Sequence, residues 1–149
     1  MTATMPGEDG SVMDFTNLYV LFDRGAGDLV STTADLNRFH RALREGKIIS
    51  SVSLADMEKP SPQSRGASYG LGYSTEFNAD SNLTLQGHTG GYPGSFTFMY
   101  YLPEQDTYVT FNLNSVGTSP GNLRTIRAAI LTYLKSGAAR DLHAGTGST

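Results

Sequence analysis

One helical pattern stands out in the first half of the chain. Leu36, Phe39 and Leu43 recur at spacings of three and four residues, which places them on one face of a helix. Thr32, followed three positions later by an acidic residue, has the spacing of a capping box. The pattern therefore predicts an amphipathic helix from about Thr33 to Glu45.

Two further helices are predicted. A short segment at Ser53–Glu58 stops before a proline. Near the C-terminus, apolar residues again recur at helical spacing; they are Leu123, Ile126, Ile130 and Leu134. Ser119 before Pro120 has the form of a helix N-cap followed by proline at the first helical position. This helix is therefore expected to begin at Pro120 and to end at Gly137.

Between these helices the period changes to that of β-strands. Four segments are rich in β-branched and aromatic residues and are separated by turn residues: Tyr69–Thr75, Asn82–Gln86, Ser95–Leu102 and Thr107–Asn114. The stretch Phe96–Leu102 is apolar on both faces, whereas a strand with one solvated face would alternate. We therefore expect both faces of this sheet to be covered.

The order of the elements is helix, helix, antiparallel strands, helix, which is typical of the α+β class. Residues 1–13 are polar and carry no period, so they are expected to form an irregular lead-in. Residues 138–149 are small and polar and are expected to form a disordered tail. The length gives a soft prior of one domain, which we place at residues 1–137.

Charge and composition exclude several classes of function. The 149 residues include 11 basic and 14 acidic ones, for a net charge of −3. No run of Lys and Arg exceeds two residues, so the chain lacks the basic stripe that binds nucleic acids and anionic membranes. No apolar stretch approaches the roughly 20 residues that span a bilayer, and no signal peptide is visible. Cysteine is absent, which excludes disulfides and thiolate metal sites and leaves the compartment undetermined.

The three histidines do not form a metal-site pattern. None of His40, His88 and His143 is four residues from another, so a metal site would need ligands assembled from distant segments. We expect neither a metal nor a cofactor. His40 lies beside the apolar stripe of the first helix and is expected to be a partly exposed structural residue, whereas His143 falls in the predicted tail.

The segment from Gly117 to Gly121 fits the Gly-x-Ser-x-Gly pattern of a nucleophile elbow, with Ser119 at its centre. An elbow uses the main-chain N–H after the nucleophile to stabilise an oxyanion. Pro120 has no N–H. Helix capping is therefore the better interpretation of Ser119.

The segment Gly87–Gly94, which reads Gly-His-Thr-Gly-Gly-Tyr-Pro-Gly, is the most informative part of the chain. It has two interpretations: a glycine-rich turn between strands, or a strand whose backbone a ligand approaches closely. Glycines in a strand permit such an approach because no side chain blocks it. His88 and Thr89 would then provide side-chain donors beside the exposed backbone.

Five segments that include this one follow one another in a distinctive order: Asp9-Gly10-Ser11, Ala26–Phe39, Leu43–Gly46, Tyr69–Tyr73 and Gly87–Gly91. This order resembles the C-terminal part of the serine β-lactamase and D-alanyl-D-alanine carboxypeptidase superfamily, and it is closest to the class C-like DD-peptidases. The resemblance covers roughly residues 7–135. It implies part of a β-lactamase/transpeptidase-like fold, in which helices pack on both faces of an antiparallel sheet. Members of this family are commonly exported.

In that family a Lys-Thr-Gly or His-Thr-Gly edge strand helps to build the active site. The resemblance implies that His88 tunes the local field and hydrogen bonds, that Thr89 donates to the substrate carboxylate, and that Gly90 keeps the strand approachable. It also implies that the N–H of Gly91 is one of two oxyanion donors, each typically worth a factor of roughly 10²–10³ in rate. The substrate class would be D-amino-acid peptides, β-lactams or small esters.

Two other elements of the family's active site are missing. No serine is followed three positions later by lysine, and no tyrosine is followed two positions later by asparagine. In the family both elements lie N-terminal to the stretch seen here. The chain is therefore expected to be a fragment of a serine acyl-hydrolase that lacks the N-terminal half of the fold and is inactive alone. The alternative is a non-catalytic ligand-binding or protein-interaction module derived from the same fold.

A half fold also implies partners. The apolar faces of Phe96–Leu102 and Leu123–Leu134 would be under-covered in a monomer, and uncovered apolar patches favour association. We therefore expect self-association or pairing with a complementary N-terminal half. The other expected partner is a small-molecule or D-amino-acid peptide substrate.

Overall fold

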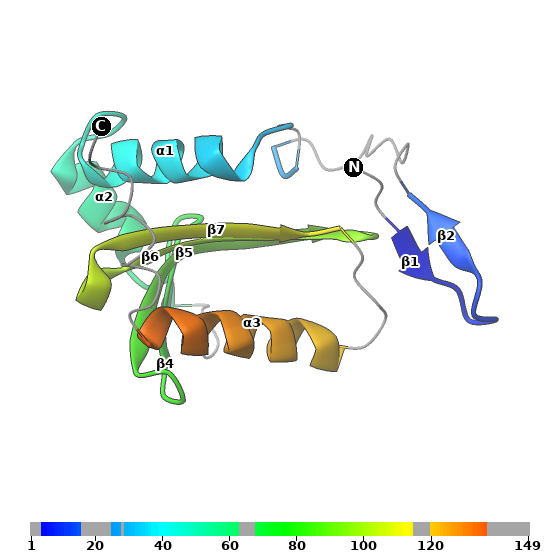
Figure 1. Cartoon of the computed structure of the whole chain (residues 1–149). Helices are drawn as coiled ribbons and strands as arrows, with labels where there is room; N and C mark the ends of the chain where they lie inside the picture. The colour runs from blue at the N-terminus through cyan, green and yellow to red at the C-terminus, as the bar shows by residue number, and fades with distance from the viewer. Residues whose placement is uncertain (1–3, 16–24, 28, 63–67, 115–119, 137–149) are drawn as a thin grey trace, which may run out of the picture.

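A five-stranded antiparallel sheet organises the chain in the computed structural model, which describes residues 4–15, 25–27, 29–62, 68–114 and 120–136 (Figure 1). The strands lie side by side in the order in which they follow in the sequence. They are β3 (Ser68–Tyr69), β4 (Ser74–Asn78), β5 (Leu83–Tyr92), β6 (Ser95–Leu102) and β7 (Thr107–Leu113). Each neighbouring pair is antiparallel, so short turns suffice to connect them.

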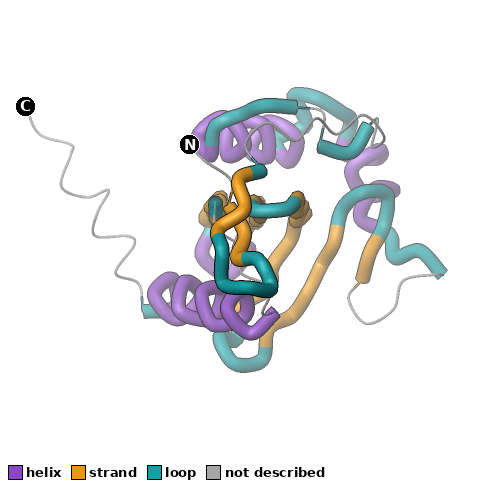
Figure 2. The backbone as a smooth tube through the Cα atoms, turned by 90° about the vertical axis from the view of Figure 1, so that its right-hand side faces the viewer, coloured by secondary structure: helices purple, strands orange, loops and turns teal. Residues whose placement is uncertain are grey.

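Helices cover the two faces of this sheet. Helix α1 (Thr33–Arg44) lies on one face and helix α3 (Pro120–Lys135) lies on the other, as Figures 1 and 2 show from two directions. Helix α2 (Ser51–Glu58) follows α1, and a short 3-10 helix, η1 (Pro103–Gln105), connects β6 to β7. The arrangement is α+β with flanking helices, and both faces of the sheet are covered, as the apolar pattern of β6 predicted.

The hydrophobic core lies between the sheet and α3. Its buried members are Leu83, Leu85, Phe98, Tyr100, Leu102, Leu131 and Leu134. The alternating residues Phe98, Tyr100 and Leu102 face α3 because side chains along a strand point to opposite faces. Phe98 also stacks on Phe111 of β7, with ring centroids 4.4 Å apart. The predicted under-coverage of Phe96–Leu102 is therefore wrong for its core residues, which one chain buries by itself.

Helix α1 forms where the sequence predicted it. The side chain of Thr32 accepts a hydrogen bond from the main-chain N–H of Asp35, which caps the helix. Leu43 is buried against the sheet, but Phe39 is 47% exposed, so the predicted stripe only partly faces the core. His40 is fully buried. The prediction of a partly exposed His40 is wrong because the helix turns this side chain, rather than Phe39, toward the sheet.

Three other predictions need correction. The lead-in is not wholly irregular, since β1 (Thr4–Pro6) and β2 (Val12–Asp14) form a small antiparallel hairpin. The strand expected at Tyr69–Thr75 is divided into β3 and β4 by a bend in which Gly72 has a φ of +70°. The glycine-rich segment Gly87–Gly94 does not form a turn before Tyr92, because β5 continues through it to that residue.

The remaining predicted elements are close to the observed ones. The strand Ser95–Leu102 is confirmed at both ends, and the next strand ends one residue earlier than predicted, at Leu113. Helix α2 begins at Ser51, two residues earlier than predicted. The N-cap at Ser119 and the tail 138–149 lie outside the described residues. None of the described helices is long and apolar enough to cross a membrane.

Candidate functional site

Strand β5 has one edge that no described strand covers along part of its length. Strand β4 pairs with β5 only from Leu83 to Gly87. From His88 to Tyr92, β5 pairs with β6 on its other edge. The segment His88–Gly91 therefore lies along this open edge. It contains all the site residues predicted from the sequence.

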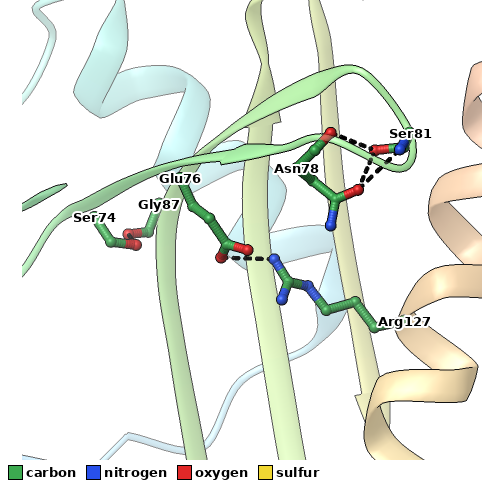
Figure 3. Close-up of polar contacts among 6 residues, drawn as sticks. All are labelled: Ser74, Glu76, Asn78, Ser81, Gly87 and Arg127. Carbon is green, nitrogen blue, oxygen red and sulfur yellow. Dashed lines mark hydrogen bonds and ion pairs between the residues drawn. The ribbon is translucent and has the colours of Figure 1, made fainter. Parts of the chain in front are cut away.

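Gly87 marks the point where β5 leaves β4. Its φ of +152° is one that side chains rarely adopt, and a Cβ there would lie 2.0 Å from the carbonyl oxygen of Met99. The hydroxyl of Ser74, the first residue of β4, donates to the carbonyl oxygen of Gly87 at 2.9 Å (Figure 3). Only glycine allows β5 to run this close to β6 at that bend.

The hydrogen bonds on either side of β5 indicate where its main-chain groups point. The carbonyl of Gly87 faces β4, through Ser74, while the N–H of Thr84 faces the opposite edge and donates to Glu104 at 3.1 Å. Main-chain polar groups alternate between the two edges of a strand. Continued past Gly87, this alternation directs the N–H groups of Thr89 and Gly91 to the open edge.

The two glycines of the site leave that edge sterically accessible. Gly90 and Gly91 are both exposed. A Cβ at Gly90 would meet no atom within 4 Å, whereas one at Gly91 would lie 2.6 Å from the ring of Phe96. No side chain projects from either position, so another molecule can approach the backbone closely.

His88 is exposed and contacts a tyrosine from the edge of the sheet. Its Nε2 lies 2.8 Å from the hydroxyl of Tyr69 on β3, and the two ring centroids are 5.8 Å apart. Sequence reasoning did not assign Tyr69 to the site. The residue does belong to the Tyr69–Tyr73 segment that carried part of the resemblance, but its contact spans 19 positions in the sequence and has no local pattern.

Thr89 borders a groove of about 470 Å³ between the sheet and α3. Aromatic residues and two arginines contribute to its walls; the full lining is Glu76, Thr89, Phe96, Phe98, Tyr100, Leu123, Arg124 and Arg127. Arg127 of α3 pairs with Glu76 of β4 at 2.7 Å, which ties the helix across the sheet (Figure 3). Burial raises the pKa of Tyr100 to about 12. The walls of the groove therefore combine apolar side chains with charged ones.

A buried polar network lies on the other side of the sheet. His40 Nε2 is 2.8 Å from the hydroxyl of Tyr73, and Arg44 donates to the same hydroxyl at 3.1 Å. Arg44 also pairs with Glu58 of α2 at 2.9 Å. Burial, and then the charge of Arg44, lower the pKa of His40 to about 4. The network joins α1, α2 and Tyr73, the residue before β4, and at neutral pH its imidazole carries no charge.

The two described histidines occupy different parts of the fold. His40 is buried in that network, whereas His88 lies on the open edge, and His143 lies outside the described residues. Among the residues that the structure describes, no three or more His, Cys, Asp or Glu side chains gather as they would around a metal ion. The groups available for hydrogen bonding are two main-chain amides at the open edge and, beside it, the hydroxyl of Thr89 and the imidazole of His88.

Comparison with known proteins finds a family model and a relative that match most of this chain. A family model described as Beta-lactamase matches residues 2–133. Penicillin-binding protein 4* of Bacillus subtilis (strain 168) is 31% identical over 113 residues, which are 72% of this chain and 24% of that protein. The chain thus spans about a quarter of the length of this curated relative.

Two solved structures have the same fold over most of the chain. A D-stereospecific amidohydrolase from Streptomyces sp. is 25% identical with a TM-score of 0.66, and the match covers 77% of this chain and 35% of that one. A D-amino acid amidase from Ochrobactrum anthropi SV3, solved as a complex with L-phenylalanine, is 25% identical with a TM-score of 0.70. That match covers 93% of this chain and 42% of the amidase.

Proposed function

The chain belongs to the beta-lactamase family, and from this premise we propose that its His88–Gly91 strand is the anion- and oxyanion-binding element of a serine acyl-hydrolase. The observation that carries the proposal is the open edge of β5. There the alternation of the strand turns the amides of Thr89 and Gly91 outward, and glycine keeps the approach clear.

Each residue of the strand has a role that its chemistry suits. The N–H of Gly91 would donate to the oxyanion that forms when an acyl carbon is attacked. The hydroxyl of Thr89 would donate to a substrate carboxylate, and Gly90 would let the substrate backbone lie against the strand. His88 would orient the local hydrogen bonds and add a donor at the start of the site. None of these groups is a nucleophile for the acyl carbon in this scheme.

The attacking group and its base would come from polypeptide other than these residues. The 149 residues contain neither Ser-x-x-Lys nor Tyr-x-Asn. In the complete site, a serine oxygen would attack the carbonyl carbon while its proton passes to the base. The carbonyl electron pair would move onto the oxygen that Gly91 faces. As that oxyanion collapses, the base would pass its proton to the leaving nitrogen, which releases the amine and leaves an acyl-serine ester for water to hydrolyse. A complementary half that carries the serine, or a longer protein that contains both halves, would meet this need.

We propose derivatives of D-amino acids as the ligand class. The names of the similar proteins support this class: one is a D-stereospecific amidohydrolase, one is a D-amino acid amidase and one is a penicillin-binding protein. All such ligands present a carbonyl beside a small chiral centre, and many carry a carboxylate. A strand that offers a hydroxyl and main-chain amides on one edge can bind both groups.

A second candidate is a non-catalytic module that binds the same ligands or a protein partner through this strand. The absence of Ser-x-x-Lys and Tyr-x-Asn favours it, since the edge can bind without a nucleophile. The two candidates share the binding step and differ in whether a complementary serine-bearing half restores acyl transfer.

The binding step is tested by NMR titration of the ¹⁵N-labelled chain with N-acetyl-D-alanine. We expect chemical-shift changes centred on the amides of Thr89, Gly90 and Gly91, with weaker binding of the L-enantiomer. Thr89→Val removes the hydroxyl at nearly constant shape and is expected to weaken binding by about twofold to tenfold. The matched control is Thr75→Val on β4, which should leave the affinity unchanged. If the shifts fall elsewhere, or if Thr75→Val weakens binding as much as Thr89→Val, the proposed site is wrong.

A further inference from the structure

We propose that Tyr69 is a positioning residue that fixes the orientation and the tautomer of His88. In this arrangement the phenol donates to Nε2 of the imidazole, so the neutral ring carries its proton on Nδ1. The Nδ1–H is then available to an anion at the open edge of β5. The statement about the anion rests on the proposed function; the statement about the tautomer does not.

The register of the sheet explains how Tyr69 reaches His88. Tyr69 of β3 is paired with Ser74, and Ser74 is paired with Gly87. His88 is therefore the first residue of β5 that has no partner in β4. Since β4 starts at Ser74, no residue of that strand lies between β3 and His88, and the tyrosine side chain spans the gap to reach Nε2 at 2.8 Å.

The peptide unit that follows Tyr69 is held in place at both its carbonyl and its N–H. Its carbonyl oxygen accepts from the N–H of Ser61 at 2.7 Å, and the N–H of Gly70 donates to the carbonyl of Tyr73 at 2.8 Å. Gly70 packs so tightly on the end of α2 that a Cβ there would lie 2.1 Å from the carbonyl oxygen of Met57. A tyrosine anchored in this way orients the imidazole, rather than following its movements.

The tautomer follows from the chemistry of the two groups. A neutral imidazole has one N–H and one acceptor nitrogen, and the hydrogen bond made by one nitrogen decides which of them carries the proton. A phenol is a good donor to an imidazole lone pair, so Nε2 is assigned as the acceptor. The described residues provide no hydrogen-bond partner for Nδ1 of His88, which stands on an exposed side chain.

The first test reads the tautomer directly, in the chain as it is, at a pH where His88 is neutral. Long-range ¹H–¹⁵N NMR distinguishes a protonated from an unprotonated ring nitrogen. We expect a protonated Nδ1 in the wild type and loss of this preference in Tyr69→Phe, which keeps the ring but removes the hydroxyl. Tyr133→Phe, at an exposed position on α3, is the matched control and should leave the signals of His88 unchanged.

The same data can overturn the inference. A wild-type spectrum with the proton on Nε2 would show that the imidazole donates to Tyr69, and the assignment of the tautomer would be wrong. An unchanged spectrum in Tyr69→Phe would show that the tyrosine does not control the ring. Thermal unfolding of each variant, followed by circular dichroism, separates loss of the hydrogen bond from loss of the fold.

A second test connects the tautomer to binding. We expect Tyr69→Phe to weaken the affinity for N-acetyl-D-alanine by about twofold to tenfold, the range for one lost hydrogen bond, while Tyr133→Phe leaves it unchanged. If the wild type binds the ligand at Thr89–Gly91 and Tyr69→Phe binds it equally well, the inferred role of the His88 Nδ1–H in binding an anion is wrong and the proposed function stands. If no ligand binds at that edge, the proposed function fails, and the tautomer measurement still decides the role of Tyr69.

Discussion

The imidazole of His40 lies against the main chain of Gly87, at the point where β5 leaves β4. A Cβ at Gly87 would be only 3.2 Å from Cε1 of His40. A buried residue of α1 therefore packs against the bend that leads into the His88–Gly91 strand. The contact connects the polar network of His40 with the open edge that carries the proposed site.

Gly87→Ala should destabilise the chain and shift the segment His88–Gly91 of β5. The new methyl group would collide with the carbonyl of Met99, 2.0 Å away, and would require a φ of +152°. A residue held in such a region costs on the order of 1–3 kcal/mol. Urea unfolding measures the loss, and the amide signals of His88–Gly91 report the shift. Gly90→Ala is the matched control, since a Cβ there meets nothing within 4 Å; equal destabilisation by both changes would contradict the prediction.

Stability should fall as the pH drops below neutrality because His40 is buried without charge. Its pKa is lowered from 6.5 to about 4 in the folded chain. The unfolded chain therefore binds more protons in this range, and the contribution of His40, fully present above pH 6.5, is lost as the pH falls to about 4. The expected total is about 3 kcal/mol, from 1.36 kcal/mol per pKa unit.

The measurement is urea unfolding at several pH values from 7 to 4. His40→Gln keeps a polar group near Tyr73 but cannot titrate, so it should flatten the pH dependence over this range. His88→Gln, at an exposed position, is the comparison variant, and the part of the pH dependence that only His40→Gln removes belongs to His40. A wild-type curve that stays level down to pH 4.5 would show that the burial of His40 has little effect on its protonation.

Much of the fold could be predicted because its strongest elements are locally consistent. Strand β6 was predicted to the residue, since a stretch from Phe96 to Leu102 that is apolar on both faces needs cover on both. Helix α1 was predicted to within one residue of its end, because Thr32 caps it and Leu43 anchors it. In these cases propensity, pattern and turn chemistry agree, and such agreement is what makes a local prediction reliable.

The residues of the candidate site could be proposed from the sequence, but their geometry could not. Glycines favour turns, so the run after Gly87 was open to a turn interpretation; pairing with β6 overrides that tendency and keeps β5 extended to Tyr92. The burial of His40 depends on Tyr73, which lies 33 positions away. The contact of His88 with Tyr69 likewise joins distant positions. Partners brought together by the sheet leave no periodic signal in the sequence.

Thr32→Ala should weaken α1 and, through it, one face of the sheet. The threonine hydroxyl accepts from the N–H of Asp35 at 3.1 Å, which satisfies one of the N–H groups that a helix start leaves unpaired. Loss of such a cap costs about 1 kcal/mol. Thermal unfolding measures the effect. Ser31→Ala, one residue earlier and exposed, is the control, and an equal loss from both substitutions would point to a cause other than capping.

The isolated chain should not catalyse acyl transfer. A polarised carbonyl still needs an attacking group and a base, and the motifs that supply them in this family are absent from the 149 residues. Oxyanion donors and binding alone leave a rate only about 10³–10⁴-fold above that in water in related serine chemistry, and here part of the surrounding cleft would be lacking too.

A chromogenic β-lactam should therefore show no turnover, and intact mass after penicillin treatment should show no adduct. His88→Ala controls for contaminating enzymes, since activity unaffected by this change would come from elsewhere. An adduct that peptide mapping locates on a serine of this chain would contradict the prediction and identify a nucleophile within it.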